Sequence, residues 1–120
     1  MCLRVLVADD STAMRKLIVR SLQAAGAHAV TEACDGDEAV AKYAAGKFDL
    51  VLTDWNMPGK SGLEVVREIR ALDAGVKIAM ITTEAENSRI AQAMEAGVSD
   101  YLVKPVAAAA LGEMLAKHGL

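Results

Sequence analysis

The chain has 120 residues, the size of one domain, which is enough to bury a core without disulfides or a structural metal. Its 13 Lys and Arg against 16 Asp and Glu give a formal charge of −3, so nucleic acid has no electrostatic reason to bind. No run approaches the roughly 18 apolar residues of a membrane span, and the first apolar run is too short and too acidic at its end for a signal peptide. We expect one cytoplasmic domain over residues 1–120 that does not interact with membranes.

Five short apolar runs predict five β-strands. Three of them are nearly continuous, as expected for strands buried on both faces of a parallel sheet, whereas the second alternates and is typical of an edge strand. In chain order, the runs are Leu3–Ala8, His28–Ala33, Leu50–Asp54, Lys77–Thr82 and Asp100–Val103.

Helical patterns fill the gaps between these runs. The first stops at Gly26, the second lies between Gly36 and Gly46, and the third opens at Ser61 with capping-box spacing. The fourth covers residues 87–96 and the fifth residues 107–117. Side chains expected on apolar faces are Met14, Leu17, Ile18, Leu22, Val65, Val66, Ile69, Leu72, Ile90, Met94, Leu111 and Leu115. Strands that alternate with helices predict an α/β fold, (βα)5, with a doubly wound parallel sheet.

Polar side chains follow four of the five strands. In such sheets, ligands bind beyond the carboxyl ends of the strands, so these side chains are expected on one rim. Taken singly, each has an ordinary explanation: a helix cap, a turn residue, a strand threonine or a solvated lysine. The set is Asp9, Asp10 and Ser11 after the first strand, Asp54 at the end of the third, Thr82 at the end of the fourth, and Lys104 after the fifth.

Three neighbouring carboxylates repel one another and favour a bound cation. Mg²⁺ suits oxygen ligands and often shares its site with phosphate, whereas thiolate- and imidazole-preferring metals lack Cys or His ligands at this rim. A carboxylate can also act as a nucleophile and form an aspartyl phosphate. Lys104 and the Thr82 hydroxyl are placed to hold the remaining phosphoryl oxygens.

The combination of Asp9-Asp10, Asp54, Thr82 and Lys104-Pro105 resembles the receiver domain of response regulators over residues 3–115. The run from Asp54 to Pro58 is most similar to chemotaxis members of that family. The resemblance implies the flavodoxin-like strand order 2-1-3-4-5 and a stand-alone receiver without an output domain. It also implies that Asp54 takes a phosphoryl group from a histidine kinase.

The same resemblance assigns roles to the other residues of the rim. Asp10, Asp54 and the backbone carbonyl of Asn56 would bind Mg²⁺ directly, and Asp9 would act through water. Lys104 would pair with the phosphoryl oxygens, and the Lys104-Pro105 peptide is typically cis in the family.

A switch is implied as well. Thr82 matches the switch hydroxyl and Tyr101 the switch aromatic, while Asn56 and Glu84 match positions that tune autodephosphorylation. The output surface would be the face of the fourth helix, fifth strand and fifth helix. Its target would be a protein, with the flagellar motor switch as one candidate; the alternative is a phosphorelay intermediate or an allosteric regulator outside chemotaxis.

Two other functions are consistent with this fold class. A magnesium-dependent phosphohydrolase of the haloacid dehalogenase type would carry Asp-x-Asp after the first strand, whereas Asp9 and Asp10 are adjacent. A flavodoxin-like cofactor binder needs a Ser/Thr/Gly-rich phosphate loop, and two aspartates there would repel phosphate. We therefore expect a signalling switch that catalyses only its own phosphorylation and dephosphorylation, rather than an enzyme acting on other substrates.

Two smaller features complete the sequence predictions. Ala107 stands where the family often has a Ser or Thr cap, so the last helix is expected to begin weakly. Cys2 and Cys34 should lie at opposite ends of the sheet, too far apart for a disulfide.

Overall fold

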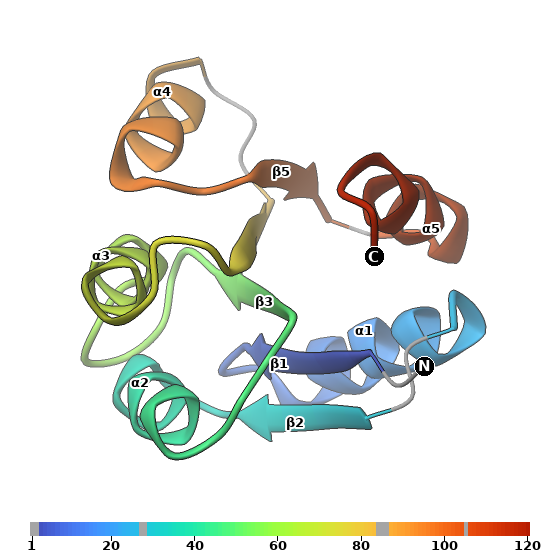
Figure 1. Ribbon diagram of the computed structural model, residues 1–120, viewed down its shortest axis with the longest axis horizontal. Coiled ribbons are helices and arrows are strands. Elements are labelled where there is room, and N and C mark those ends of the chain that lie inside the picture. Colours follow the sequence, from blue (N-terminus) through green and yellow to red (C-terminus); the bar gives the residue numbers. More distant parts are fainter. Residues whose placement is uncertain (1–2, 27–28, 84–86, 105) are drawn as a thin grey trace.

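The computed structural model describes residues 3–26, 29–83, 87–104 and 106–120 (Figure 1). Within these residues, strands and helices alternate as the sequence predicts. The strands are β1 (Arg4–Ala8), β2 (Ala29–Ala33), β3 (Leu50–Asp54), β4 (Lys77–Thr82) and β5 (Asp100–Val103). The helices are α1 (Thr12–Ala24), α2 (Gly36–Ala45), α3 (Gly62–Leu72), α4 (Asn87–Ala96) and α5 (Ala108–Lys117).

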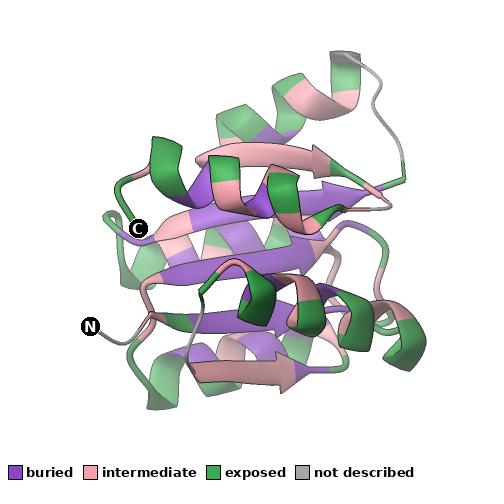
Figure 2. Ribbon diagram, turned by 90° about the vertical axis from the view of Figure 1, so that its right-hand side faces the viewer, coloured by how far each residue is buried: buried purple, intermediate pink, exposed green. Residues whose placement is uncertain are grey.

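The strands form one parallel sheet in the order β2-β1-β3-β4-β5. This confirms the α/β class and the flavodoxin-like order, and it places the alternating strand β2 at an edge. Helices α1 and α5 cover one face of the sheet, and α2, α3 and α4 cover the other (Figure 1). The central strands are buried on both faces, which explains why their sequences are almost continuously apolar (Figure 2).

Three side chains expected on apolar helix faces are instead more than half exposed: Leu17, Leu72 and Met94. In α1, Ile18 and Leu22 face the sheet, and Leu17 is turned outward beside them. In α3, Leu72 is the last helical residue, beyond the buried Ile69. In α4, Ala93 is the one buried residue among those whose burial is described, and Met94 lies on the solvent side. The apolar periodicity predicted the helices correctly, but it predicted more buried positions on each apolar face than the structure shows.

Side-chain caps begin three helices. Ser11, Asp35 and Ser61 each accept a hydrogen bond from a backbone N–H in the first turn of α1, α2 and α3 respectively. Ala107 occupies the same place before α5 in extended backbone, with no side-chain cap. Ala107 therefore stands at the cap position as predicted, and the weak start of the last helix stays a prediction.

Ala107→Ser is expected to stabilise the protein. The exposed position already has the backbone conformation of a cap (φ −79°, ψ 152°), so a hydroxyl there gains a hydrogen bond to a first-turn N–H. The expected gain is about 1 kcal/mol in the free energy of unfolding, measured by urea denaturation. Ala109→Ser, inside the same helix, is the matched control and should lose a few tenths of a kcal/mol. Equal effects of the two substitutions would contradict the capping argument.

Cys34 is exposed and free of any disulfide, while Cys2 lies outside the described residues. Within the part of the chain that the structure describes, no helix has both the length and the apolar character required to cross a membrane.

Candidate functional site

The rim at the carboxyl ends of the strands brings the predicted residues together. Because β1 pairs with β3, Ala8 lies opposite Thr53, and the next residues, Asp9 and Asp54, are therefore neighbours. On the other side of the sheet centre, Thr82 lies opposite Val103, one residue before Lys104. Parallel pairing thus turns residues that are distant in sequence into one cluster.

The core of this cluster is acidic. One carboxylate oxygen from each of Asp9, Asp10 and Asp54 lies within 4.8 Å of the others. Asp9 is buried, Asp54 is half-buried and Asp10 is exposed. The exposed position of Asp10 leaves this cluster open to a small cation from solvent. Oxygen ligands of this kind suit a hard divalent ion such as Mg²⁺.

Lys104 reaches into the acidic cluster. Its Nζ lies 2.8 Å from Asp9 Oδ2 and 3.3 Å from Asp54 Oδ2, and its side chain is only 8% exposed. The backbone N–H of Lys104 donates to the carbonyl of Thr82 at 2.8 Å, which fixes where the side chain starts. The ordinary explanation of Lys104 as a solvated charge is therefore wrong.

The charges in the cluster do not balance, because three carboxylates face one ammonium. Burial raises the pKa of the Asp54 carboxyl above its usual value, Lys104 opposes this, and the nearby Asp9 charge raises it further. An added cation would offset the cost of keeping the Asp54 carboxylate charged while it is partly buried, and it would reduce the repulsion between Asp54 and Asp9. The donor set and its excess negative charge therefore fit Mg²⁺.

Asp9 already has partners for both carboxylate oxygens. Oδ2 accepts from Lys104, and Oδ1 accepts from the backbone N–H of Ser11 at 2.9 Å. Its backbone is held too, since Arg15 Nη1 donates to the Asp9 carbonyl at 2.7 Å and Arg15 Nε pairs with Glu32. An indirect role for Asp9, with a cation held mainly by its neighbours, agrees with this arrangement.

The segment after β3 is shaped around Asp54. The backbone N–H of Trp55 donates to Asp54 Oδ1 at 2.8 Å, and Asn56 follows in the exposed loop. At the start of α3, a Cβ on Gly62 would lie 2.1 Å from the Asp54 carbonyl oxygen. Glycine is therefore required for α3 to approach the loop so closely.

Sequence reasoning missed the contributions of Gly62 and Arg15. The signal for Gly62 was available, because a glycine in the first turn of a helix is a poor helix former and needs a packing reason. Arg15 gave no such signal, since its role depends on the meeting of α1, β2 and the end of β1.

Of the predicted switch residues, Thr82 is fully buried at the end of β4 and Tyr101 is partly exposed on β5. Thr82 and Tyr101 lie on neighbouring strands: Tyr101 is opposite Met80, two residues before Thr82 on β4. Glu84 and Pro105 lie outside the described residues, so their predicted roles stay predictions.

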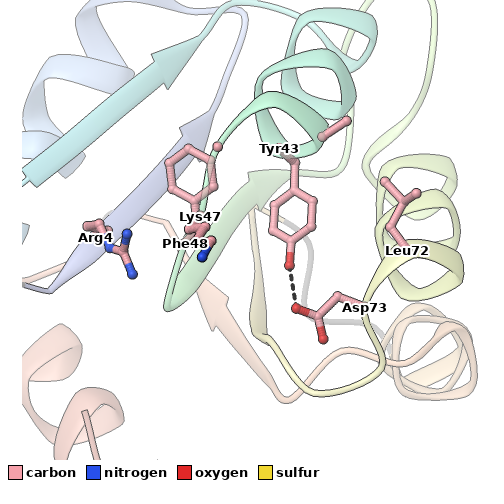
Figure 3. Close-up of a pocket in the computed structure, with 8 residues that line it drawn as sticks. Arg4, Tyr43, Lys47, Phe48, Leu72 and Asp73 are labelled. Atoms are coloured by element: carbon pink, nitrogen blue, oxygen red, sulfur yellow. Dashed lines mark hydrogen bonds between the residues drawn. The ribbon is translucent and has the colours of Figure 1, made fainter.

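A separate hollow of about 550 Å³ lies at the opposite, amino-terminal end of the sheet (Figure 3). Stacked rings of Tyr43 and Phe48 form part of it, and the Tyr43 hydroxyl donates to Asp73 Oδ2 at 2.9 Å. Arg4 and Lys47 are among its other lining residues. It holds none of the acidic cluster and is separate from the chemistry of the rim.

The Tyr43 hydroxyl in this hollow is expected to make the stability of the protein sensitive to alkaline pH. Burial, together with the hydrogen bond to Asp73 and its charge, raises the pKa of Tyr43 to about 12 from its usual 10. Because the folded protein disfavours the phenolate, the free energy of unfolding falls as the pH rises from 10 towards 12. Below pH 10, Tyr43 makes its full contribution to that free energy. Urea midpoints at pH 8, 10 and 11 should fall less in Tyr43→Phe than in the wild type. Parallel declines in the two proteins would contradict this assignment.

Comparison with known proteins agrees with the geometry. The family model described as "Response regulator receiver domain" matches residues 5–116. The chain is 42% identical over 118 residues to the chemotaxis protein CheY-3 of Vibrio cholerae, covering 96% of this chain and 90% of that protein. It is 39% identical over 118 residues to the chemotaxis protein CheY of Pseudomonas aeruginosa, covering 96% and 94% of the two chains.

Solved structures of CheY proteins have the same fold as this chain. CheY4 of Vibrio cholerae superposes with a TM-score of 0.90 at 34% identity, covering 98% of each chain. The chain in a CheX–CheY–BeF₃–Mg complex from Borrelia burgdorferi superposes with a TM-score of 0.92 at 25% identity, covering 98% of this chain and 90% of that one.

Proposed function

The chain belongs to the response regulator receiver domain family, and we propose that it signals by accepting a phosphoryl group on Asp54 from a histidine kinase. The observation that carries this proposal is the position of Asp54, half-buried among two further carboxylates with the Lys104 ammonium 3.3 Å from its Oδ2. The arrangement pairs a nucleophilic oxygen with a cation placed for an incoming phosphoryl group.

The proposed reaction moves the phosphoryl group from a phosphohistidine of the kinase to Asp54. A carboxylate oxygen of Asp54 bonds to phosphorus, the phosphorus–nitrogen bond of the donor phosphohistidine breaks, and the electron pair returns to the imidazole, which takes up a proton. The product is an acyl phosphate on Asp54, and Lys104 pairs with a phosphoryl oxygen. Autodephosphorylation then transfers the group to water.

Asp10, Asp54 and the Asn56 carbonyl would hold Mg²⁺, with Asp9 acting through water. When bound, this ion supplies positive charge that screens phosphoryl oxygens from the acids. The chain's own residues do the remaining work: Asp54 attacks, Lys104 neutralises and the Trp55 N–H orients the acceptor carboxylate.

The output is proposed to be a change in a protein-binding surface. Phosphorylation would draw the Thr82 hydroxyl towards the phosphoryl group, let Tyr101 pack inward and alter the face formed by α4, β5 and α5. This is a population shift between two states, driven by a local change of charge.

Trp55, beside the acceptor, provides the test. Its fluorescence is expected to change when Mg²⁺ is added, and again with acetyl phosphate or beryllium fluoride. Radiolabelled acetyl phosphate should label the protein only when Mg²⁺ is present. A wild-type protein that takes up no label and shows no second fluorescence change would overturn the proposal.

We propose chemotaxis as the pathway, with the flagellar motor switch as the target, because the two relatives named above are chemotaxis proteins of similar length. The alternative is a phosphorelay intermediate or an allosteric regulator outside chemotaxis. A pull-down with and without beryllium fluoride distinguishes them: capture of a motor-switch protein supports chemotaxis, and capture of a phosphotransfer protein supports the alternative.

We also propose that the protein is a switch rather than a phosphohydrolase. The adjacent Asp9 and Asp10 support this, because the Asp9 carboxylate is occupied by Lys104 and Ser11 and is not placed as a free acid. Steady turnover of small phosphate esters by the wild-type protein would contradict it.

A further inference from the structure

We infer that Arg89, on α4, is a positioning residue that couples this helix directly to the phosphorylation site through the ring of Trp55. The inference rests on the proposed function and adds to it a second connection between Asp54 and the output face. This connection runs through Trp55 rather than through the proposed switch residues Thr82 and Tyr101.

The contact itself is a cation–π interaction. Arg89 Cζ lies 4.9 Å from the centroid of the Trp55 ring, within the roughly 6 Å range of such contacts. Trp55 is only 7% exposed, so the ring is held in a largely water-free setting where this attraction is strongest. Arginine suits the position because its planar guanidinium can stack on the ring while keeping its charge.

Trp55 also contacts the acceptor. Its backbone N–H donates to Asp54 Oδ1 at 2.8 Å, so one residue joins the reacting carboxylate to α4. The other described connection runs from Asp54 through Lys104, whose backbone N–H donates to the carbonyl of Thr82. Helix α4 is therefore linked to the site through Asp54 Oδ1, whereas Lys104 approaches Oδ2.

The direction of the coupling follows from charge. In the unphosphorylated state, Lys104 already neutralises one charge of the cluster, and α4 brings a second cation up to the residue beside Asp54. Phosphorylation adds negative charge at Asp54, which strengthens the attraction of Arg89 for this region. Arg89 therefore favours the phosphorylated state, and phosphorylation in turn holds α4 more firmly, because coupling between two sites is reciprocal.

The test uses beryllium fluoride with Mg²⁺ and measures affinity by calorimetry, which does not depend on Trp55 emission. Arg89→Gln is expected to bind beryllium fluoride about five-fold more weakly than the wild type, and Arg89→Lys should recover part of the loss because it keeps the charge. Arg67→Gln is the matched control, because Arg67 is exposed on α3 and its substitution removes the same charge at a different place.

A second readout separates coupling from simple packing. Hydrogen exchange of the α4 amides should slow when beryllium fluoride binds the wild type, and this slowing should be lost in Arg89→Gln. If the wild type binds and Arg89→Gln matches it in both affinity and exchange, the coupling is wrong while the proposed function stands. If the wild type fails to bind beryllium fluoride, the proposed function fails and the inference falls with it.

Discussion

Asp54→Asn is expected to reduce phosphorylation by acetyl phosphate to below about 1% of the wild-type rate, because the amide removes the nucleophilic oxygen of the proposed acyl phosphate. Lys104, Asp9 and Asp10 remain in place, so residual labelling would have to come from another group. The measurement is radiolabel incorporation in Mg²⁺, with intact-mass analysis to count the phosphoryl groups. Labelling at the wild-type rate would show that Asp54 is not the acceptor.

The same substitution should leave the fold intact, which makes the loss of labelling interpretable. Burial and Asp9 raise the pKa of Asp54, so the folded protein disfavours its charged form. This destabilisation is absent below the ordinary pKa of 3.8 and develops as the pH rises through the raised folded value. At neutral pH without Mg²⁺, a neutral Asn avoids it, and the unfolding free energy of Asp54→Asn should equal or exceed that of the wild type. A large loss would mean that the ion pair with Lys104 outweighs burial.

The fold was predictable because its signals are local. Continuous apolar runs marked β1, β3 and β4, and alternation marked β2 as an edge, since the number of buried faces determines which positions must be apolar. The width of the buried helix stripes was not predictable. Leu17 and Met94 are apolar yet exposed, because the neighbours Ile18 and Ala93 take the places facing the sheet.

The candidate site also has contacts that the sequence predicts and contacts that it does not. Asp9, Asp54 and Lys104 could be predicted to meet, because each lies at or directly after the carboxyl end of a strand, and these ends reach the same rim. The contact of Arg89 with Trp55 could not, because it depends on how α4 is turned against the loop after β3. Helix periodicity predicts only that Arg89 lies off the buried face of the helix, and no sequence pattern predicts its contact with an aromatic ring.

Lys104→Met is expected to destabilise the protein by about 3–5 kcal/mol in the absence of divalent cations, as is typical when one partner of a buried ion pair is removed. The ammonium lies 2.8 Å from Asp9 and 3.3 Å from Asp54, and both pairs are shielded from water. Methionine retains the bulk of the side chain, so the loss reports mainly on charge. Urea denaturation in EDTA measures it. Lys117→Met is the control, because its ammonium, 3.6 Å from Asp100, is mostly exposed and should cost less than about 1 kcal/mol.

Magnesium should reverse much of this loss, because the same substitution changes the charge of the cluster from three acids against one cation to three acids alone. We expect Lys104→Met to bind Mg²⁺ at least about ten-fold more tightly than the wild type, and saturating Mg²⁺ to restore stability through binding to the folded state. Lys104→Met should bind beryllium fluoride more weakly than the wild type, because the ammonium proposed to pair with phosphoryl oxygens is absent. Opposite shifts for the cation and the phosphoryl analogue are difficult to obtain from a general disruption of the site. Weaker binding of both would show that Lys104 only holds the fold together.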